Sequence, residues 1–227
     1  MQSRLRGDAL TTPHVFYLHG FASSAKSTKA GFFGAKLRER GLTLHTPDFN
    51  EPDFSTLTIT RMIEQTTAAV SALPPGPVIL IGSSLGAFVA VQTALRLATS
   101  TSHPIVRLVL LAPALDFSGN RTRDLGDRGL EEWQSTGELN VFHYGYGRLI
   151  PVHYELYTDA RGYDCVNAEL TMPIQIFQGT RDTAVDPTSV EKWAASRPNV
   201  ELHMLDDDHQ LTESLDHIWQ SVDRLIG

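Results

Sequence analysis

A serine stands between two glycines in the segment GSSLG at residues 82–86. The apolar run VILI at 78–81 precedes this segment, and a run with helical spacing of apolar residues follows at 85–98. The pattern G-x-S-x-G between a strand and a helix is typical of a sharp turn that lifts a serine hydroxyl above a sheet. We therefore predict that Ser84 is a nucleophile; the alternative is a strand-to-helix turn with only a structural role.

A serine nucleophile needs a general base, and His209 is the histidine best placed to supply it. It lies in the segment MLDDDHQL, after the last predicted strand and before the last predicted helix. Ligand sites of open α/β sheets lie at the carboxyl ends of the strands, the edge where Ser84 is also expected. The aspartates at 206–208 are expected to form a solvated acidic loop. His143 and His153 lie in the insertion at 116–168 and could instead touch a substrate.

The acid that orients the base is predicted to be Asp182, in the segment QIFQGTRDTAVDP that follows the penultimate strand. Asp186 is an alternative, although the proline after it favours a role as a helix cap. Asp116, after the strand that ends near residue 112, is a third candidate. The chain order Ser84, Asp182, His209 is the order expected for a serine on this kind of turn.

Negative charge develops on a carbonyl oxygen under attack, and two backbone N–H groups are needed to stabilise it. One is predicted to be the N–H of Leu85, the residue after the nucleophile. The other is predicted to be the N–H of Phe21, in the loop LHGF after the first strand. Gly20 lets the chain turn there, and His19 is expected to shape the loop and to lie within reach of the substrate.

Predicted strands and helices alternate along the chain and would position these residues. The expected strands are apolar runs at 15–18, 42–46, 78–81, 105–112, 173–179 and 200–205. The expected helices lie at 27–41, 55–73, 85–98, 187–196 and 211–227. Continuous apolar runs, as opposed to alternating ones, indicate a parallel sheet covered on both faces. The predicted class is therefore α/β, doubly wound.

The bulk composition fits one α/β domain of 227 residues, with 41% hydrophobic and 20% charged residues. The net charge of −7 argues against a nucleic-acid partner or an anionic membrane surface. Cys165 is the one cysteine in the sequence, which fits a reducing compartment. We find no apolar run long enough for membrane insertion and no signal-peptide pattern at the start, so a cytoplasmic protein is expected. The oligomeric state is left open.

Four motifs resemble the α/β-hydrolase superfamily: HGF at 19–21, GSSLG at 82–86, GTRD at 179–182 and DDDH at 206–209. More narrowly, the chain resembles small bacterial carboxylesterases and thioesterases with the pattern LHGFxSS near the start. The resemblance implies an α/β-hydrolase fold with a minimal six-stranded, mostly parallel sheet, helices on both faces and strand order 2-1-3-4-5-6. Two further strands are usual in the superfamily, but they cannot fit before residue 15.

The resemblance also implies the activity. Ser84 would attack a short- to medium-chain acyl ester and form an acyl-enzyme, His209 would move the proton, and Asp182 would orient His209. The partner would be a small-molecule ester or thioester, and neither a metal nor an organic cofactor would be needed. Alternatives on the same three residues are a thioesterase, a carbon–carbon bond hydrolase or an acyltransferase. A non-catalytic ligand-binding protein is a further alternative.

Residues 116–168 show no regular pattern and lie where hydrolases of this type carry a cap, so we expect a cap or lid within a single domain over 1–227. Aromatic side chains in this insertion would line the acyl site or pack the cap onto the domain. The candidates for contact with substrate are Trp133, Phe142, Tyr144 and Tyr146. Arginines there would meet an anionic group or lie in solvent; they are Arg121, Arg123, Arg128 and Arg148.

Overall fold

A computed structural model describes residues 12–226 of the chain. Residues 1–11, on which the expectation about a signal peptide depends, lie outside the described part. Six strands form one sheet in the order β2-β1-β3-β4-β7-β8, and every neighbouring pair is parallel. The strands are β1 (His14–Leu18), β2 (Leu44–His45), β3 (Val78–Ser83), β4 (Ile105–Leu111), β7 (Ile174–Gly179) and β8 (Val200–Leu205). The predicted strand order is confirmed.

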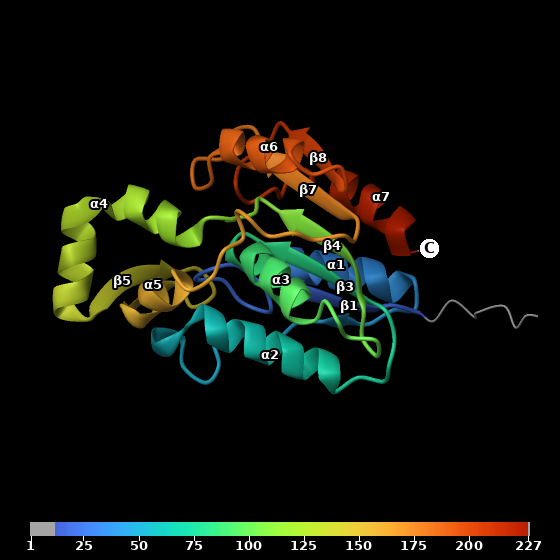
Figure 1. Cartoon of the computed structure of the whole chain (residues 1–227), viewed down its shortest axis with the longest axis horizontal. Helices are drawn as coiled ribbons and strands as arrows, with labels where there is room; N and C mark the ends of the chain where they lie inside the picture. The colour runs from blue at the N-terminus through green and yellow to red at the C-terminus, as the bar shows by residue number, and fades with distance from the viewer. Residues whose placement is uncertain (1–11, 227) are drawn as a thin grey trace, which may run out of the picture.

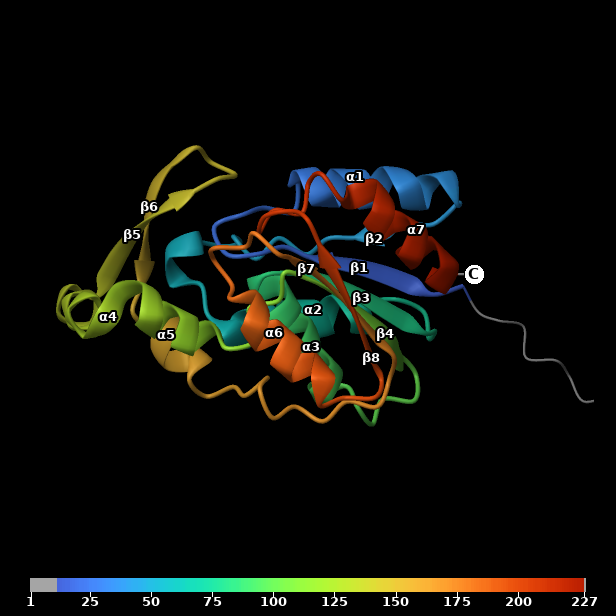
Figure 2. The same ribbon diagram turned by 90° about the horizontal axis from the view of Figure 1, so that it is seen from above.

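Helices cover both faces of the sheet, as Figures 1 and 2 show. On one face lie α1 (Thr28–Glu39) and α7 (Leu215–Ile226); on the other lie α2 (Ile59–Ser71), α3 (Leu85–Arg96) and α6 (Pro187–Ala195). Every residue of β3 and β7 is buried, because helices pack on both sides of these strands. This explains why the strands read as continuous apolar runs in the sequence. No helix between residues 12 and 226 is long and apolar enough to cross a membrane.

The segment between β4 and β7 is regular, so the expectation of an irregular stretch over 116–168 is wrong. It forms α4 (Phe117–Thr136), a hairpin of β5 (Glu138–His143) and β6 (Arg148–His153), and α5 (Glu155–Ala160). Gly126 breaks the helical pattern of α4, since its backbone lies at φ 63 and ψ 176 within the helix. Figures 1 and 2 show that this insertion lies beyond the carboxyl ends of the sheet's strands.

Hydrogen bonds tie the β5–β6 hairpin to the loop after β1. The N–H of Tyr144 donates to the carbonyl oxygen of Ala22 at 2.8 Å. The Nε2 atom of His143 lies 3.0 Å from Oδ1 of Asn50, whose Nδ2 donates to the carbonyl oxygen of Ser23 at 2.9 Å. His143 and Asn50 are both buried, so water does not compete strongly for these bonds. The insertion is therefore anchored next to the residues that follow β1.

The junction between β3 and α3 has no space for side chains at its two glycines. A Cβ atom on Gly86 would lie 2.0 Å from the carbonyl oxygen of Leu18, in β1. A Cβ atom on Gly82 would lie 2.5 Å from the carbonyl oxygen of Gly86. Both contacts are with backbone atoms, which cannot rotate away. Glycine at these two positions lets α3 start directly against the sheet.

We expect Gly86→Ala to destabilise the protein by about 3 kcal/mol, because the added methyl group forces α3 away from β1. For a domain of this size the melting temperature should fall by roughly 6–12 °C. The matched control is Gly31→Ala in α1, where a Cβ atom would have no neighbour within 4 Å. That change should stabilise the protein slightly. Calorimetry on both variants checks this, and equal melting temperatures for the two would contradict the account of the junction.

Candidate active site

Ser84 sits in a strained backbone conformation at the end of β3, with φ 54 and ψ −116. Such a conformation costs a non-glycine residue on the order of 1–3 kcal/mol and persists only where the surrounding structure enforces it. Four hydrogen bonds do so here: the N–H of Ser84 donates to Leu111, and its carbonyl oxygen accepts from Ala87, Phe88 and Ala114. The turn holds the Ser84 side chain partly exposed at the carboxyl edge of the sheet.

His209 links Ser84 to Asp182. Its Nδ1 atom lies 2.8 Å from Oδ2 of Asp182, and its Nε2 atom lies 3.1 Å from Oγ of Ser84. An ionised carboxylate can only accept hydrogen bonds, so Nδ1 carries the ring proton and Nε2 is left to accept from the serine hydroxyl. The structure thus brings together the three side chains that the sequence analysis selected from three separate loops.

Asp182 is held by four donors, two on each carboxylate oxygen. Its Oδ2 accepts from His209 and from Nε2 of Gln178, while its Oδ1 accepts from the N–H groups of Ala184 and Val185. Burial raises the pKa of this carboxyl, but the bonds and the charge of His209, together with the bonds from Val185 and Gln178, outweigh burial and lower it. Asp182 is therefore ionised near neutral pH although its side chain is fully buried.

The loops that carry Asp182 and His209 are bonded to each other. The N–H of Arg181 donates to the carbonyl oxygen of Asp207, and a Cβ atom on Gly179 would lie 2.5 Å from that same oxygen. The expectation that 206–208 is a solvated acidic loop is wrong at its centre. Asp207 is 1% exposed, and its carboxylate accepts from the N–H groups of Asp208 and Ser214. This carboxylate fixes the turn that presents His209.

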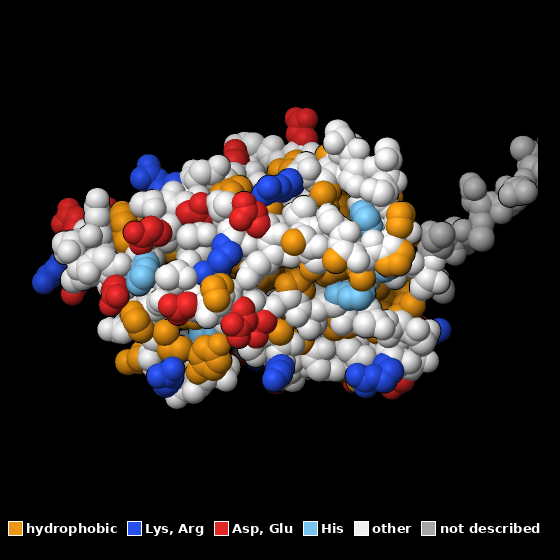
Figure 3. Space-filling model, turned by 90° about the horizontal axis from the view of Figure 1, so that it is seen from below, with side chains coloured by type: hydrophobic (Ala, Val, Ile, Leu, Met, Phe, Trp, Pro, Cys, Tyr) orange, Lys and Arg blue, Asp and Glu red, His pale blue; other side chains and the backbone are white. Residues whose placement is uncertain are grey.

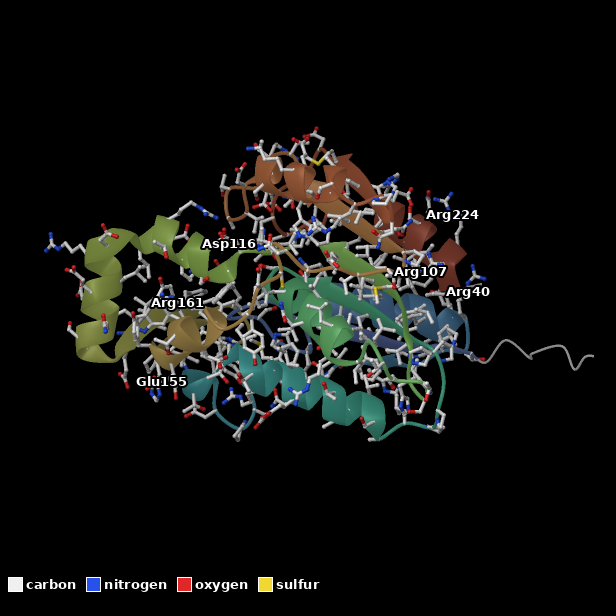
Figure 4. The ribbon with its side chains drawn as sticks, viewed as in Figure 1. Arg40, Arg107, Asp116, Glu155, Arg161 and Arg224 are labelled. Carbon is white, nitrogen blue, oxygen red and sulfur yellow. The ribbon has the colours of Figure 1, made fainter. Side chains whose placement is uncertain are left out.

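The two alternative acids cap helices. Asp186 accepts from the N–H of Thr188 at the start of α6, and Asp116 accepts from the N–H of Gly119 at the start of α4. Figure 4 shows Asp116 at the junction between the sheet and the insertion. Since no hydrogen bond joins either carboxylate to His209 in the described structure, Asp182 is the one of the three that contacts the base.

The N–H groups of Phe21 and Leu85 are the two that the sequence analysis predicts as donors to a developing oxyanion. Within residues 12–226 neither N–H donates to a protein acceptor. Leu85 begins α3, and the first N–H groups of a helix have no partner inside the helix. The loop of Phe21 touches the nucleophile's turn, because a Cβ atom on Gly20 would lie 3.3 Å from Cβ of Ser84.

His19 shapes this loop but does not line the cleft, which corrects the expectation that it contacts substrate. The residue is 2% exposed, and its ring packs at a tilt against Phe49. The Nε2 atom accepts from the N–H of Phe49 at 3.0 Å, and Nδ1 lies 3.0 Å from the carbonyl oxygen of Gly20. Both ring nitrogens therefore hold backbone groups, one of them directly before Phe21.

A cleft of about 1290 Å³ opens over Ser84 and His209 and is lined by Phe142, Tyr144 and Tyr146 of the hairpin. Figure 3 shows hydrophobic side chains gathered at the lower left, over this part of the insertion. Trp133 does not line the cleft, so the expectation for it is wrong. It is 1% exposed, and its indole N–H donates to the carbonyl oxygen of Val152 inside the insertion.

The two histidines of the insertion, His143 and His153, both contact side chains of the protein. His143 is buried and stacks against Tyr146, with Nε2 beside Asn50, and His153 lies 3.5 Å from Glu138. Among residues 12–226 no group of three or more His, Cys, Asp or Glu side chains is arranged to hold a metal ion.

The sequence analysis missed Lys29, which lies in α1 but faces the site. It is 7% exposed, it lines the cleft, and its Nζ donates to the carbonyl oxygen of Gln210 at 2.7 Å. Burial lowers the pKa of Lys29 to about 8, although Asp208, Asp207 and Asp182 oppose the shift. A lysine in a surface helix normally points to solvent, so the sequence around Lys29 does not indicate that its side chain is buried in the cleft. Only the contact with the loop of His209, far away in the sequence, shows this.

The sheet order, the turn at Ser84 and the helices on both faces define the α/β-hydrolase superfamily. Within it, the chain belongs to the uncharacterised protein family UPF0227, whose family model matches residues 14–225. No curated protein sequence matches the chain.

Solved structures share the fold over nearly the whole chain. A provisionally assigned hydrolase from Agrobacterium vitis S4 is 25% identical, with a TM-score of 0.84, over 95% of this chain and 88% of the other. The α/β-hydrolase domain-containing protein 10 from mouse is 20% identical, with a TM-score of 0.78, over 95% and 90%. Est1E from Butyrivibrio proteoclasticus is 17% identical, with a TM-score of 0.74, over 96% and 88%.

Because the Lys29 ammonium is buried, we expect the free energy of unfolding to depend on pH. The folded protein releases this proton near pH 8, whereas the unfolded chain releases it near 10.5. The unfolded chain therefore binds more protons between these values, so wild type gains roughly 3 kcal/mol of stability as the pH rises through this window. Lys29→Met lacks the titrating group and should not share that gain.

Urea unfolding at pH 7, 9 and 10.5 measures the free energy of unfolding of wild type and of Lys29→Met. From pH 7 to pH 10.5, we expect the free energy of unfolding of wild type to rise by roughly 3 kcal/mol relative to that of Lys29→Met. All other titrating groups cancel in this difference. A difference that stays constant with pH would show that the Lys29 ammonium is not desolvated in the folded protein.

Proposed function

We propose that the protein is a serine carboxylesterase. The observation that carries this proposal is the hydrogen-bonded series from Asp182 through His209 to Ser84, with separations of 2.8 and 3.1 Å. Each group is in the state that the reaction needs: an ionised, fully bonded carboxylate, an imidazole with its proton on Nδ1, and a serine on a strained turn. The likeness to structures of hydrolases and esterases supports the same class of reaction.

In the proposed reaction, Oγ of Ser84 attacks the carbonyl carbon of an ester while Nε2 of His209 takes the hydroxyl proton. The carbonyl π bond becomes an oxyanion, which accepts hydrogen bonds from the N–H groups of Phe21 and Leu85. When the oxyanion collapses, the bond to the alcohol breaks, and His209 gives its proton to the departing alkoxide. A water molecule then attacks the acyl-enzyme in the same way, releasing the acid and restoring Ser84.

The insertion at 116–168 is proposed to act as a cap whose hairpin contacts the substrate. Phe142, Tyr144 and Tyr146 line the cleft and remain substantially exposed, between 48% and 74%, so they offer apolar surface to a ligand. One structure of Est1E, which shares the fold, contains ferulic acid. These features support acyl esters of short to medium chain length as the substrate class.

Hydrolysis of p-nitrophenyl esters with acyl chains from two to twelve carbons tests the proposal. We expect wild type to turn over the shorter esters and Ser84→Ala to lose activity on the order of 10⁶-fold. The matched control is Ser83→Ala, which removes the adjacent hydroxyl and should retain most of the activity. If only Ser83→Ala lost activity, Ser83 and not Ser84 would be the nucleophile. Turnover of acyl thioesters without turnover of any oxygen ester would replace the carboxylesterase by a thioesterase.

The role of Asp182 is tested against Asp186, four residues further along. Asp182→Asn should lower kcat about 10⁴-fold, because an amide at Oδ2 can donate to Nδ1 and would favour the wrong tautomer of His209. Asp186→Asn keeps a side chain that caps a helix, so it should leave kcat within a few-fold of wild type. Steady-state kinetics on one ester compares the two, and equal losses would contradict the assignment of Asp182.

A further inference from the structure

One face of α4 looks into the cleft that contains Ser84. Phe117, Asn120 and Arg121 all line it, and their spacing of three and four residues places them on the same side of the helix. Arg123 lies on another side: its side chain is 59% exposed, and it pairs with Asp116 at 3.5 Å. Arg121 is therefore the arginine of α4 that the fold turns toward the proposed nucleophile.

The guanidinium of Arg121 lies against two aromatic rings. Its central carbon is 5.8 Å from the ring centroid of Phe21 and 5.6 Å from that of Phe117. Its side chain is only 26% exposed, and burial lowers the pKa of Arg121, an effect that Asp124 opposes. The group still carries its charge at any pH at which the protein would function, because arginine is not deprotonated in proteins.

One carboxylate only partly satisfies this cation. Oδ2 of Asp124 lies 2.7 Å from Nη2, but the Nε atom of Arg121 is buried and has no acceptor among the described residues. A guanidinium can bind a planar carboxylate with two parallel hydrogen bonds, and Nε with Nη2 forms one such pair. Asp124 is 45% exposed, so its carboxylate can turn to solvent when another anion takes its place.

The position of Arg121 relates this cation to the proposed chemistry. The ring of Phe21 under the guanidinium belongs to the residue whose N–H is assigned to the oxyanion. Two lysines also line the cleft: Lys29 already donates to Gln210, and Lys26 is exposed to solvent. The acidic residues Asp48 and Glu51 lie toward the hairpin tip, where burial and their charges raise the pKa of Tyr146. The α4 side of the cleft therefore favours an anion.

We propose that Arg121 binds a carboxylate carried by the substrate, so that the protein acts preferentially on anionic esters. This proposal rests on the esterase activity proposed above and specifies its substrate class. A carboxylate on the acyl chain and one on the alcohol share the same chemistry, and the choice of esters distinguishes them. A purely structural role for Arg121, as a cover for the two rings, predicts no dependence on substrate charge.

The experiment compares three esters of matched size: p-nitrophenyl pentanoate, the p-nitrophenyl monoester of glutaric acid, and 4-carboxyphenyl pentanoate. The first is neutral, the second carries a carboxylate on the acyl chain, and the third carries one on the leaving group. Each is assayed with wild type, Arg121→Met and Arg123→Met. Methionine keeps an unbranched apolar stem over Phe21 and Phe117, and Arg123 supplies a control of identical chemistry outside the cleft.

We expect Arg121→Met to lower kcat/KM for at least one anionic ester about ten- to hundredfold, the range for a lost hydrogen bond to a charged group. The neutral ester should change less than twofold, and Arg123→Met should change none of the three selectively. The anionic ester that is affected identifies the side of the scissile bond. Equal losses on all three esters, or no loss on either anionic ester, would overturn the proposal.

Binding of glutarate, measured by calorimetry, tests Arg121 without turnover. If wild type hydrolyses no ester, the proposed function fails, and calorimetry still decides the role of Arg121. Glutarate that binds wild type and Arg123→Met but not Arg121→Met would support the carboxylate site, whereas equal binding or no binding to wild type would contradict it.

Discussion

The close approach of α3 to β1 and β3 is the constraint on which the rest of the site depends. Gly82 and Gly86 leave no space for a Cβ atom, so the chain must leave β3 in a turn that places Ser84 at φ 54. Backbone hydrogen bonds to two neighbouring segments, residues 111–114 and the start of α3, hold that conformation. The side chain consequently stands at the carboxyl edge of the sheet, and the loops after β1, β7 and β8 converge on it.

Two sets of buried polar contacts bring those loops to the same place. The carboxylates of Asp182 and Asp207 each accept from N–H groups of their own loop and so fix the two turns after β7 and β8. The bond between His209 and Asp182 and the bond from the N–H of Arg181 to Asp207 join these turns to each other. On the other side, His143 and Asn50 join the hairpin of the insertion to the loop after β1. The wall of the cleft and the proposed oxyanion donor at Phe21 are thus held by one hydrogen-bonded unit.

The resemblance to the α/β-hydrolase superfamily predicted the strand order, and local patterns in the sequence predicted the elements that carry Ser84, Asp182 and His209. They succeeded because each of these side chains follows a buried strand, and parallel strands end at one edge of a sheet. The regular structure of the insertion was missed, although LNVFHYGYGRLIPVH has the form of two strands joined by a glycine-containing turn, with Gly147 at φ 65.

Long-range burial accounts for the remaining errors. Trp133 resembles a cleft aromatic in sequence, but its indole N–H finds a partner in Val152, on a strand that sequence analysis did not detect. Lys29 donates to Gln210, which is far away in the sequence, and Gln178 donates to the buried carboxylate of Asp182. Neither residue belongs to a sequence motif that would have indicated its contact. Asp207 reads as one of three solvated aspartates, and only the fold shows that Ser214 returns to donate to it.

Covalent labelling with a fluorophosphonate tests the central claim most directly, because the reagent reacts with a serine only when a base activates it. Peptide mass spectrometry after labelling should find one adduct, on Ser84, and His209→Ala should lose it. That result would establish an activated nucleophile independently of any choice of substrate. An unlabelled protein, or an adduct on Ser83, would contradict the account, since the strained turn and the contact with His209 would then serve structure alone.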